Sequence, residues 1–238
     1  MNNGVKLLLD IAFPRRCPFC DTLMPFGGAK ICGSCRKRLP FAGNDYCLKC
    51  GRPLSDKGRE FCPACEGTSH AFDSGRSLLV YDDFVRHSIA GFKYKNKREY
   101  ADFYGEEICR RLGRYICSKH PDMLIPVPVS AKKLKSRGYN QAELIAKVIS
   151  RITGIPLRND VIIRERDTAP QKDLGRTQRQ KNLKKAFKIT SNVVELKTIM
   201  VIDDIYTTGS TIDEISVTLK SAGAGRVYFV TLAAGRPL

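Results

Sequence analysis

Two adjacent carboxylates followed by a loop of small polar residues form the part of the chain best suited to chemistry. Asp203 and Asp204 come directly after an apolar run at 199–202, which has the length of a buried parallel strand. Open α/β sheets bind ligands at the carboxyl ends of such strands. A helix is predicted to follow, so its positive end and the backbone N–H groups before it favour a phosphate, unless the aspartates serve only as helix caps. The phosphate-loop candidates are Thr207, Thr208, Gly209, Ser210 and Thr211.

Eight of the ten cysteines form four C-x-x-C pairs that recur with a 15-residue period. Two such pairs bring four thiolates together, which is the ligand set of structural zinc sites. Because four thiolates leave no open position for water or substrate, the sites are predicted to be structural and not catalytic. The pairs are Cys17 and Cys20, Cys32 and Cys35, Cys47 and Cys50, and Cys62 and Cys65.

The pairing of these four units stays open at this stage. Sequential pairing gives a double zinc ribbon, with the first two units at one metal and the last two at the other. A cross-braced arrangement would join the first unit to the third. Disulfides and an iron–sulfur cluster are the alternatives to zinc, although nothing else indicates an oxidising compartment. His70 is predicted to be a surface residue, and Cys109 and Cys117 to be small core residues on a helix.

Basic residues at 92–99 alternate with aromatic ones, a pattern that fits a nucleic-acid backbone with stacked bases and equally fits a solvated helix end. The candidate nucleic-acid residues are Lys93, Tyr94, Lys95, Lys97 and Arg98.

Two further basic segments are predicted to be loops near the acidic pair. One follows the apolar run at 123–129 and is suited to pyrophosphate oxygens, with a solvated turn as the alternative. The other, at 164–188, is suited to closing over a phosphorylated ligand, with a solvated hairpin as the alternative. Their candidate residues are Lys132, Lys133, Arg137, Arg176 and Arg179.

The elements between these segments follow the pattern of a parallel α/β sheet. Strands are predicted at 77–81, 123–129, 161–164, 199–202 and 227–232, with no element after 232. Helices are predicted at 83–117 with a break near 92–99, from Asn140 onward, and from Ile212 to a C-cap at Gly223. The cysteine-rich composition ends near residue 71. We therefore expect an N-terminal helix and zinc ribbons at 1–71 and a sheet domain at 72–238.

The chain of 238 residues has 41 basic and 24 acidic residues, which give a formal charge of +17. Two zinc sites of four thiolates each would lower this only to about +13. Such a charge attracts nucleic acid, phosphorylated metabolites or anionic lipid, or serves solubility alone. No apolar run reaches the roughly 18 residues that cross a membrane. Asp10 and the lack of a small-residue cleavage site argue against a signal peptide, so a cytoplasmic location is expected.

The order of the motifs resembles one known family. VIDDIYTTGST at 201–211 resembles the phosphoribosyl-pyrophosphate (PRPP) motif of type I phosphoribosyltransferases. Together with the C-x-x-C pairs, YKNKRE at 94–99, RGYNQA at 137–142 and QKDLGRTQRQKN at 171–182, it resembles the ComF family. Members of that family are linked to natural competence and DNA uptake in bacteria.

This resemblance implies a type I phosphoribosyltransferase-like fold that binds PRPP with Mg²⁺. Asp203 and Asp204 would contact the ribose hydroxyls as the catalytic-site acids, and residues 207–211 would hold the 5′-phosphate. The resemblance also implies action on incoming single-stranded DNA, with a DNA-uptake helicase or other competence proteins as partners.

Three functions remain compatible with the sequence. The first is a DNA-handling protein. The second is a phosphoribosyltransferase, in which a base or amine attacks the anomeric carbon as pyrophosphate leaves and the developing charge is stabilised electrostatically. The third is a regulator that binds PRPP without turnover. The sequence shows no recognisable acceptor-binding segment, so it does not choose between them.

Overall fold

The computed structural model describes residues 14–25, 28–56, 58–165, 186–191 and 193–235. Its helices are α2 (Gly33–Lys37), α3 (Pro63–Glu66), α4 (Asp83–Tyr94), α5 (Tyr100–Ser118), α6 (Ala131–Arg137), α7 (Gln141–Thr153) and α9 (Ser210–Ser221). Its strands are β1 (Ser74–Tyr81), β2 (Met123–Pro126), β3 (Ile162–Arg164), β4 (Phe187–Ile189), β5 (Thr198–Tyr206) and β6 (Arg226–Gly235). The expected N-terminal helix and the basic loop with Arg176 and Arg179 lie outside the described residues.

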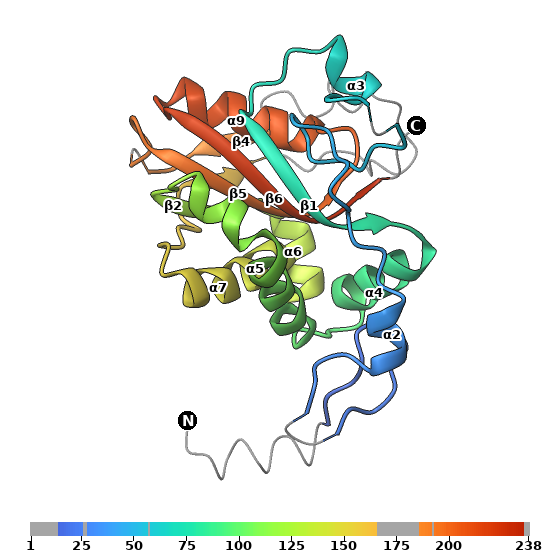
Figure 1. The fold of residues 1–238 in the computed structure, drawn as a ribbon. Coiled ribbons are helices and arrows are strands. Elements are labelled where there is room, and N and C mark those ends of the chain that lie inside the picture. The colour runs from blue at the N-terminus through green and yellow to red at the C-terminus, as the bar shows by residue number, and fades with distance from the viewer. Residues whose placement is uncertain (1–13, 26–27, 57, 166–185, 192, 236–238) are drawn as a thin grey trace.

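Within these residues, the main sheet has four parallel strands in the order β1-β6-β5-β2 (Figure 1). The predicted parallel unit around the acidic pair is confirmed as β5–α9–β6. Strand β6 runs further than expected, because its small residues continue to pair with β1 as far as Tyr81 and Gly235. The predicted strand at 161–164 instead forms β3 of a separate two-stranded antiparallel sheet with β4.

Both faces of the sheet are covered, as its continuous apolar strands require. Met200 and Ile202 belong to a core cluster shared with α4, α5 and α7, whereas Ile199 and Val201 belong to a cluster shared with α9. Because successive strand residues point to opposite faces, these clusters lie on the two sides of the sheet (Figure 1). We call them the α5 face and the α9 face.

The break that was predicted between two helices is confirmed by α4 and α5. Cys109 on α5 packs against the α5-face cluster, as expected of a small core residue. The expectation for Cys117 was wrong, because this residue is exposed in the last turn of α5.

The two cysteine ribbons pack on opposite faces of the sheet. Cys17 and Phe19 of the first ribbon belong to the α5-face cluster, where the Phe19 ring stacks on Phe84 with centroids 4.8 Å apart. Cys47 and Cys50 of the second ribbon belong to the α9-face cluster. Each ribbon therefore shares a core with the sheet. The domain boundary that the sequence predicts between residues 71 and 72 stays a prediction.

The chain between the ribbons crosses the outer edge of β1. Ala42 donates its N–H to the carbonyl of Leu78 at 3.0 Å, and Val80 donates to the carbonyl of Pro40 at 2.7 Å. Further along, the N–H of Gly75 donates to the carbonyl of Lys49 at 2.9 Å. These bonds satisfy the exposed edge of the sheet and carry the second ribbon to the α9 face.

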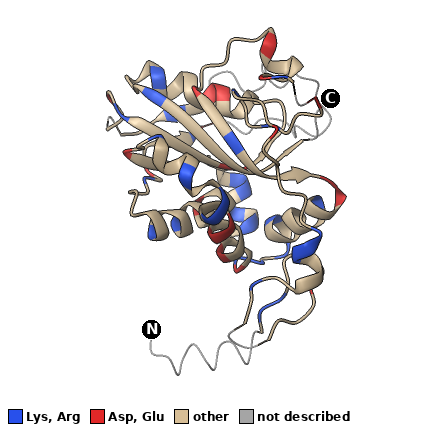
Figure 2. Cartoon of the chain, viewed as in Figure 1, with Lys and Arg blue, Asp and Glu red and all other residues tan. Residues whose placement is uncertain are grey.

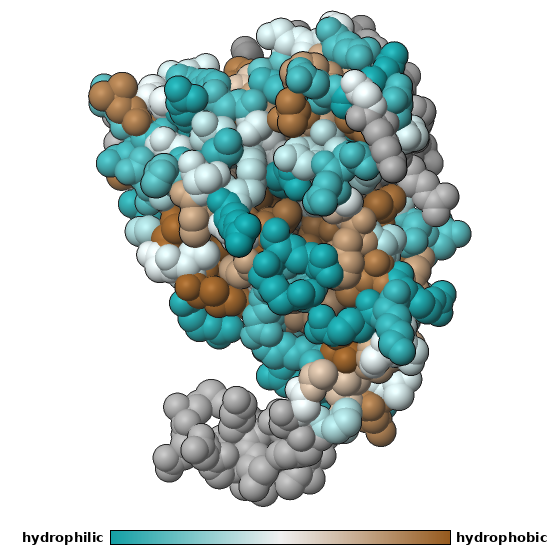
Figure 3. All heavy atoms as spheres, in the orientation of Figure 1, coloured by the Kyte–Doolittle hydropathy of each residue, from teal (hydrophilic) through white to brown (hydrophobic). Residues whose placement is uncertain are grey.

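The surface is rich in basic residues, and Figure 2 shows Lys and Arg recurring over α5, α6 and α7. On the face shown in Figure 3, hydrophilic residues predominate, with smaller hydrophobic areas between them. Among the described helices, none combines the length and the apolar character needed to span a membrane.

Candidate functional site

The eight paired cysteines form two clusters of four. The sulfur atoms of Cys17, Cys20, Cys32 and Cys35 lie within 4.8 Å of one another, as do those of Cys47, Cys50, Cys62 and Cys65. Sequential pairing is therefore confirmed, and the cross-braced alternative is wrong. No disulfide joins any of the ten cysteines.

The spacing of the sulfur atoms fits tetrahedral zinc. A zinc–sulfur distance of about 2.3 Å places the sulfurs of a tetrahedron about 3.8 Å apart. Cys32 Sγ lies 3.7 Å from the sulfurs of both Cys17 and Cys20, and Cys50 Sγ lies 3.8 Å from that of Cys62. Four cysteines at each position would hold Zn²⁺ in a closed, structural site.

The acidic pair lies where β2 ends and β5 continues. The last pairing of β2 joins Pro126 to Ile202, whereas β5 stays paired with β6 as far as Tyr206. The predicted strand was too short, because pairing with β6 extends it through the two aspartates. Asp203 and Asp204 consequently sit on a strand that has lost one neighbour at its carboxyl end, a place where α/β sheets admit ligands.

The two carboxylates have different surroundings. Asp204 Oδ2 lies 2.7 Å from Lys93 Nζ, and these side chains are only 16% and 17% exposed. Burial, and after it the neighbouring charge of Asp204, raise the pKa of Asp203 to about 7. The N–H of Asp204, which donates to Asp203 Oδ1 at 2.8 Å, and the charges of Lys93 and Arg164 oppose this rise.

Lys93 is one of the candidate nucleic-acid residues, and that role stays a prediction. It lies in the last turn of α4, where its ammonium group reaches the acidic pair instead of solvent. Its position could not be read from the sequence, because α4 and β5 are far apart in the chain.

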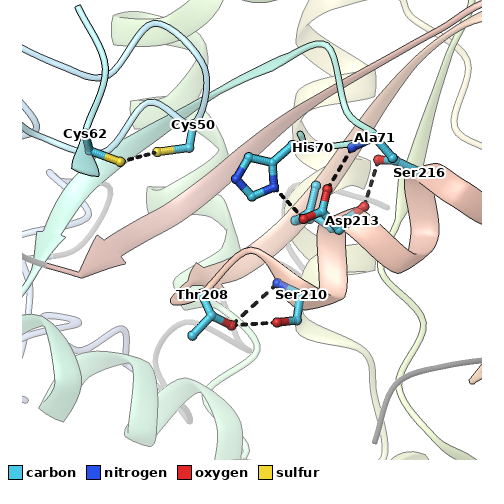
Figure 4. A network of polar contacts seen from close by, with 9 residues as sticks. Cys50, Cys62, His70, Ala71, Thr208, Ser210, Asp213 and Ser216 are labelled. Carbon is cyan, nitrogen blue, oxygen red and sulfur yellow. Dashed lines mark hydrogen bonds and ion pairs between the residues drawn. The ribbon is translucent and has the colours of Figure 1, made fainter. Parts of the chain in front are cut away.

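The phosphate-loop candidates form a tight turn into α9 (Figure 4). Gly209 has a φ of +83°, and a Cβ atom there would collide with the Tyr206 side chain. The hydroxyls of Thr208 and Ser210 lie 2.9 Å apart. This left-handed turn needs glycine, and it places the hydroxyls of the loop beside the positive end of α9.

The second ribbon contacts this loop and helix directly. The guanidinium of Arg52 donates to the carbonyl of Thr207 and lies 5.8 Å from the Tyr206 ring centroid. On α9, Asp213 accepts the N–H of Ala71 at 3.0 Å and lies 2.5 Å from His70 Nδ1 (Figure 4).

The surface position expected for His70 was wrong, because its side chain is only 2% exposed. Its ring stacks on Phe72 with centroids 4.7 Å apart, and Asp213 supplies a polar partner inside the fold. Neither contact has a signal in the local sequence.

Comparison with known proteins agrees with this arrangement. The model of a family described as "Double zinc ribbon domain" matches residues 8–66. Competence protein F of Haemophilus influenzae (strain ATCC 51907 / DSM 11121 / KW20 / Rd) is 37% identical over 117 residues, which are 48% of this chain and 51% of that protein. DNA utilization protein YhgH of Salmonella typhi is 36% identical over 107 residues, 45% and 47% of the two chains. Competence protein ComFC of Bacillus subtilis (strain 168) is 29% identical over 138 residues, 58% and 54% of the two chains. These matches and the double zinc ribbon support the resemblance of the chain to the ComF family.

The alignments span about half the length of each of these relatives. Among solved structures, a purine phosphoribosyltransferase from Pyrococcus horikoshii Ot3 is 17% identical, with a TM-score of 0.37 over 56% of this chain and 74% of that chain. A phosphoribosylpyrophosphate synthetase from Mycobacterium smegmatis is 18% identical, with a TM-score of 0.33 over 56% and 33%.

The pyrophosphate candidates that follow β2 lie on a helix. The loop predicted there was wrong: Ser130 caps α6 by accepting the N–H of Lys133 at 3.4 Å, and Gly138 ends the helix with a φ of +75°. Both caps are typical and were visible in the sequence. Lys132 and Lys133 are exposed on α6, at the same end of the sheet as the acidic pair.

The helix end at 92–99 meets the segment that follows α6. The Arg137 guanidinium lies 5.0 Å from the Tyr94 ring centroid, and that of Arg98 lies 4.9 Å from the Tyr139 ring centroid. Tyr94 is 62% exposed, and Lys95 next to it is also exposed. We call Tyr94, Lys95, Arg98 and Arg137 the aromatic–basic surface.

Lys97 is not part of the aromatic–basic surface, because its side chain is paired with a carboxylate. Its ammonium group lies 3.3 Å from Asp21 Oδ1 of the first ribbon, so it links that ribbon to the end of α4.

Proposed function

We propose that this protein binds PRPP with Mg²⁺ at the carboxyl end of β5. One observation carries the proposal. Two partly buried carboxylates and a left-handed, glycine-dependent turn into a helix lie on one continuous strand–loop–helix unit, at the open side of a parallel sheet. This geometry suits a ligand that combines hydroxyls with a phosphate.

The residues of the unit then have distinct roles. Asp203 and Asp204 accept hydrogen bonds from the two ribose hydroxyls. The backbone and hydroxyls of residues 207–211 hold the 5′-phosphate, which the positive end of α9 favours.

Basic residues near the same edge suit the pyrophosphate. Lys132, Lys133 and Arg137 follow β2 on α6, and Arg176 and Arg179 remain candidates outside the described residues. Mg²⁺ bound with PRPP would neutralise part of the pyrophosphate charge, as this ion does for phosphates generally.

We further propose that single-stranded DNA binds at the aromatic–basic surface. The exposed ring of Tyr94 with the guanidinium of Arg137 over it offers a platform for one base, and neighbouring cations suit the phosphate backbone. The names of the relatives, which refer to competence and DNA utilization, support a role in DNA uptake, with a helicase or other competence protein as partner.

The decisive experiment measures PRPP binding by calorimetry with Mg²⁺ and zinc-loaded protein, beside the double variant Asp203→Asn and Asp204→Asn. We expect binding by the wild type and its loss in the variant. Absence of wild-type binding would refute the proposal.

Measuring pyrophosphate release in the presence of free bases or a single-stranded oligonucleotide distinguishes catalytic turnover of PRPP from binding without turnover. Release that requires one acceptor identifies a phosphoribosyltransferase and the class of its acceptor. Binding without release identifies a protein regulated by PRPP.

DNA binding is tested by fluorescence anisotropy with a labelled single-stranded oligonucleotide at several salt concentrations. Affinity should fall steeply with salt, because phosphate contacts release counterions. Tyr94→Ala should weaken binding about fivefold or more, because stacking on one aromatic ring contributes about 1–3 kcal/mol. Arg226→Ala, at the opposite end of the sheet, serves as the control. If the affinity for the oligonucleotide changes neither with salt nor in Tyr94→Ala, this surface is not the DNA-binding site.

A further inference from the structure

Arg52 is a buried cation at the phosphate loop. It follows the Cys47–Cys50 unit of the second zinc site and is only 7% exposed. Its Nη2 donates to the carbonyl of Thr207, whereas its Nε is buried and has no hydrogen-bond partner. Among the described residues, the Thr207 carbonyl is the one hydrogen-bond acceptor that this side chain reaches, and it is neutral.

Within the described part of the chain, the buried charge of Arg52 meets only a neutral hydrogen-bond acceptor, and one of its N–H donors is unsatisfied. Burying a charge is costly unless it is paired and its donors are satisfied. The thiolates of the second zinc site supply some negative charge nearby, and the backbone N–H of Arg52 bonds to Cys50. The guanidinium, however, donates to the loop that precedes α9, where an anion is favoured.

The position of Arg52 is fixed by the way its ribbon is attached. Gly51, the preceding residue, has a φ of +68°, and a Cβ atom there would collide with the backbone of Gly75 on β1. At the end of the same ribbon, His70 and Ala71 bind Asp213 on α9. The ribbon is thus held at both the sheet and the helix, so Arg52 is presented to the loop in a defined place.

We propose that Arg52 is a phosphate-binding residue, and that the 5′-phosphate held by residues 207–211 is its counter-ion. The second zinc ribbon would then complete the ligand site of the sheet domain. Guanidinium groups suit this role, because their fork of N–H donors matches phosphate oxygens. The inference rests on the proposed binding of PRPP at this loop.

The test compares two substitutions that separate charge from support of the loop. Arg52→Gln removes the charge but keeps a side-chain N–H donor, whereas Arg52→Met removes both. Arg59→Gln is the matched control, because Arg59 lies in the same ribbon but is exposed and lies 3.9 Å from both Asp56 and Glu66. Zinc content and thermal unfolding are measured for each variant, so that only folded, zinc-loaded protein is compared.

The probes are ribose 5-phosphate and inorganic pyrophosphate, each titrated by calorimetry, with PRPP as reference. Both Arg52 variants should bind ribose 5-phosphate about tenfold or more weakly than the wild type, as expected for loss of a charge-assisted hydrogen bond. Their affinity for pyrophosphate, and all affinities of Arg59→Gln, should stay unchanged.

Two other outcomes would overturn the inference in different ways. Wild-type affinity in Arg52→Gln with loss only in Arg52→Met would mean that Arg52 merely supports the loop through Thr207. If the wild type binds neither PRPP nor ribose 5-phosphate, both this inference and the proposed function would be overturned.

Discussion

Lys93 and Asp204 form an ion pair between the last turn of α4 and the carboxyl end of β5, with Nζ and Oδ2 2.7 Å apart. The pair places a cation beside two adjacent carboxylates that would otherwise repel an anionic ligand. It also joins the aromatic–basic surface to the acidic pair, because Tyr94 follows Lys93 directly. The two proposed ligands would therefore bind next to each other.

Lys93→Ala should weaken PRPP binding about tenfold, because the charge that offsets Asp204 at a partly buried position is lost. Lys95→Ala is the control: this lysine is exposed on the same helix end, and its loss should weaken only the binding of single-stranded DNA. Calorimetry with PRPP and anisotropy with an oligonucleotide measure the two effects. Tighter PRPP binding by Lys93→Ala would show instead that Lys93 competes with the ribose for Asp204.

Asp203→Asn should stabilise the protein above neutral pH. The pKa of Asp203 is raised from 3.8 to about 7, so the fold holds a proton that the unfolded chain has already released. Its favourable contribution is therefore complete below about pH 4 and is lost as the pH rises toward 7. The asparagine stays neutral and can still accept the N–H of Asp204.

Urea unfolding at pH 5 and pH 8 checks this prediction. The gain in stability of Asp203→Asn over the wild type should grow between these two pH values by about 1–3 kcal/mol. A gain that is the same at both pH values would mean that the carboxyl does not titrate in this range.

Gly209→Ala should disrupt the phosphate loop. A side chain at a φ of +83° is strained, and its Cβ atom would collide with Tyr206. We expect a loss of about 1–3 kcal/mol in stability and at least tenfold weaker PRPP binding. Gly113→Ala on α5 is the control, since a Cβ atom there meets nothing within 4 Å and alanine favours helices. Unchanged PRPP affinity in Gly209→Ala would argue against this loop as the phosphate site.

The acidic pair and its loop could be predicted because they are contiguous. Strand, carboxylates, glycine turn and helix follow one another between Thr198 and Ser221, so local pattern was sufficient. The cysteine period similarly predicted the two four-sulfur clusters, although only the structure decided their pairing. The helical cap signals at Ser130 and Gly138 were equally local and could have identified α6.

The contacts that complete the site could not be predicted in this way. Arg52 reaches Thr207, Lys93 reaches Asp204 and His70 reaches Asp213 only because distant segments pack together. The second ribbon arrives there because the preceding chain bonds to the edge of β1. The spacing of residues along the sequence does not reveal that the chain crosses the edge of β1. For this reason the buried His70 was predicted to be a surface residue.

The two zinc sites should contribute differently, because they lie on opposite faces of the sheet. Cys50→Ser removes a ligand of the second site, beside Arg52 and the phosphate loop. Cys20→Ser removes a ligand of the first site, whose ribbon contacts α4 through Phe19 and Lys97 through Asp21. We expect the first substitution to weaken mainly PRPP binding and the second to weaken mainly DNA binding.

Metal analysis should give two zinc ions per wild-type chain and one in each variant, because each cluster has its own four thiolates. Full removal of zinc with a chelator should lower the unfolding temperature strongly, since both ribbons share their cores with the sheet. Equal losses of PRPP affinity in Cys20→Ser and Cys50→Ser, at matched zinc content, would contradict the different roles predicted for the two zinc sites. Such a result would mean that the ribbons stabilise the sheet as a whole and that the second one has no particular relation to the phosphate loop.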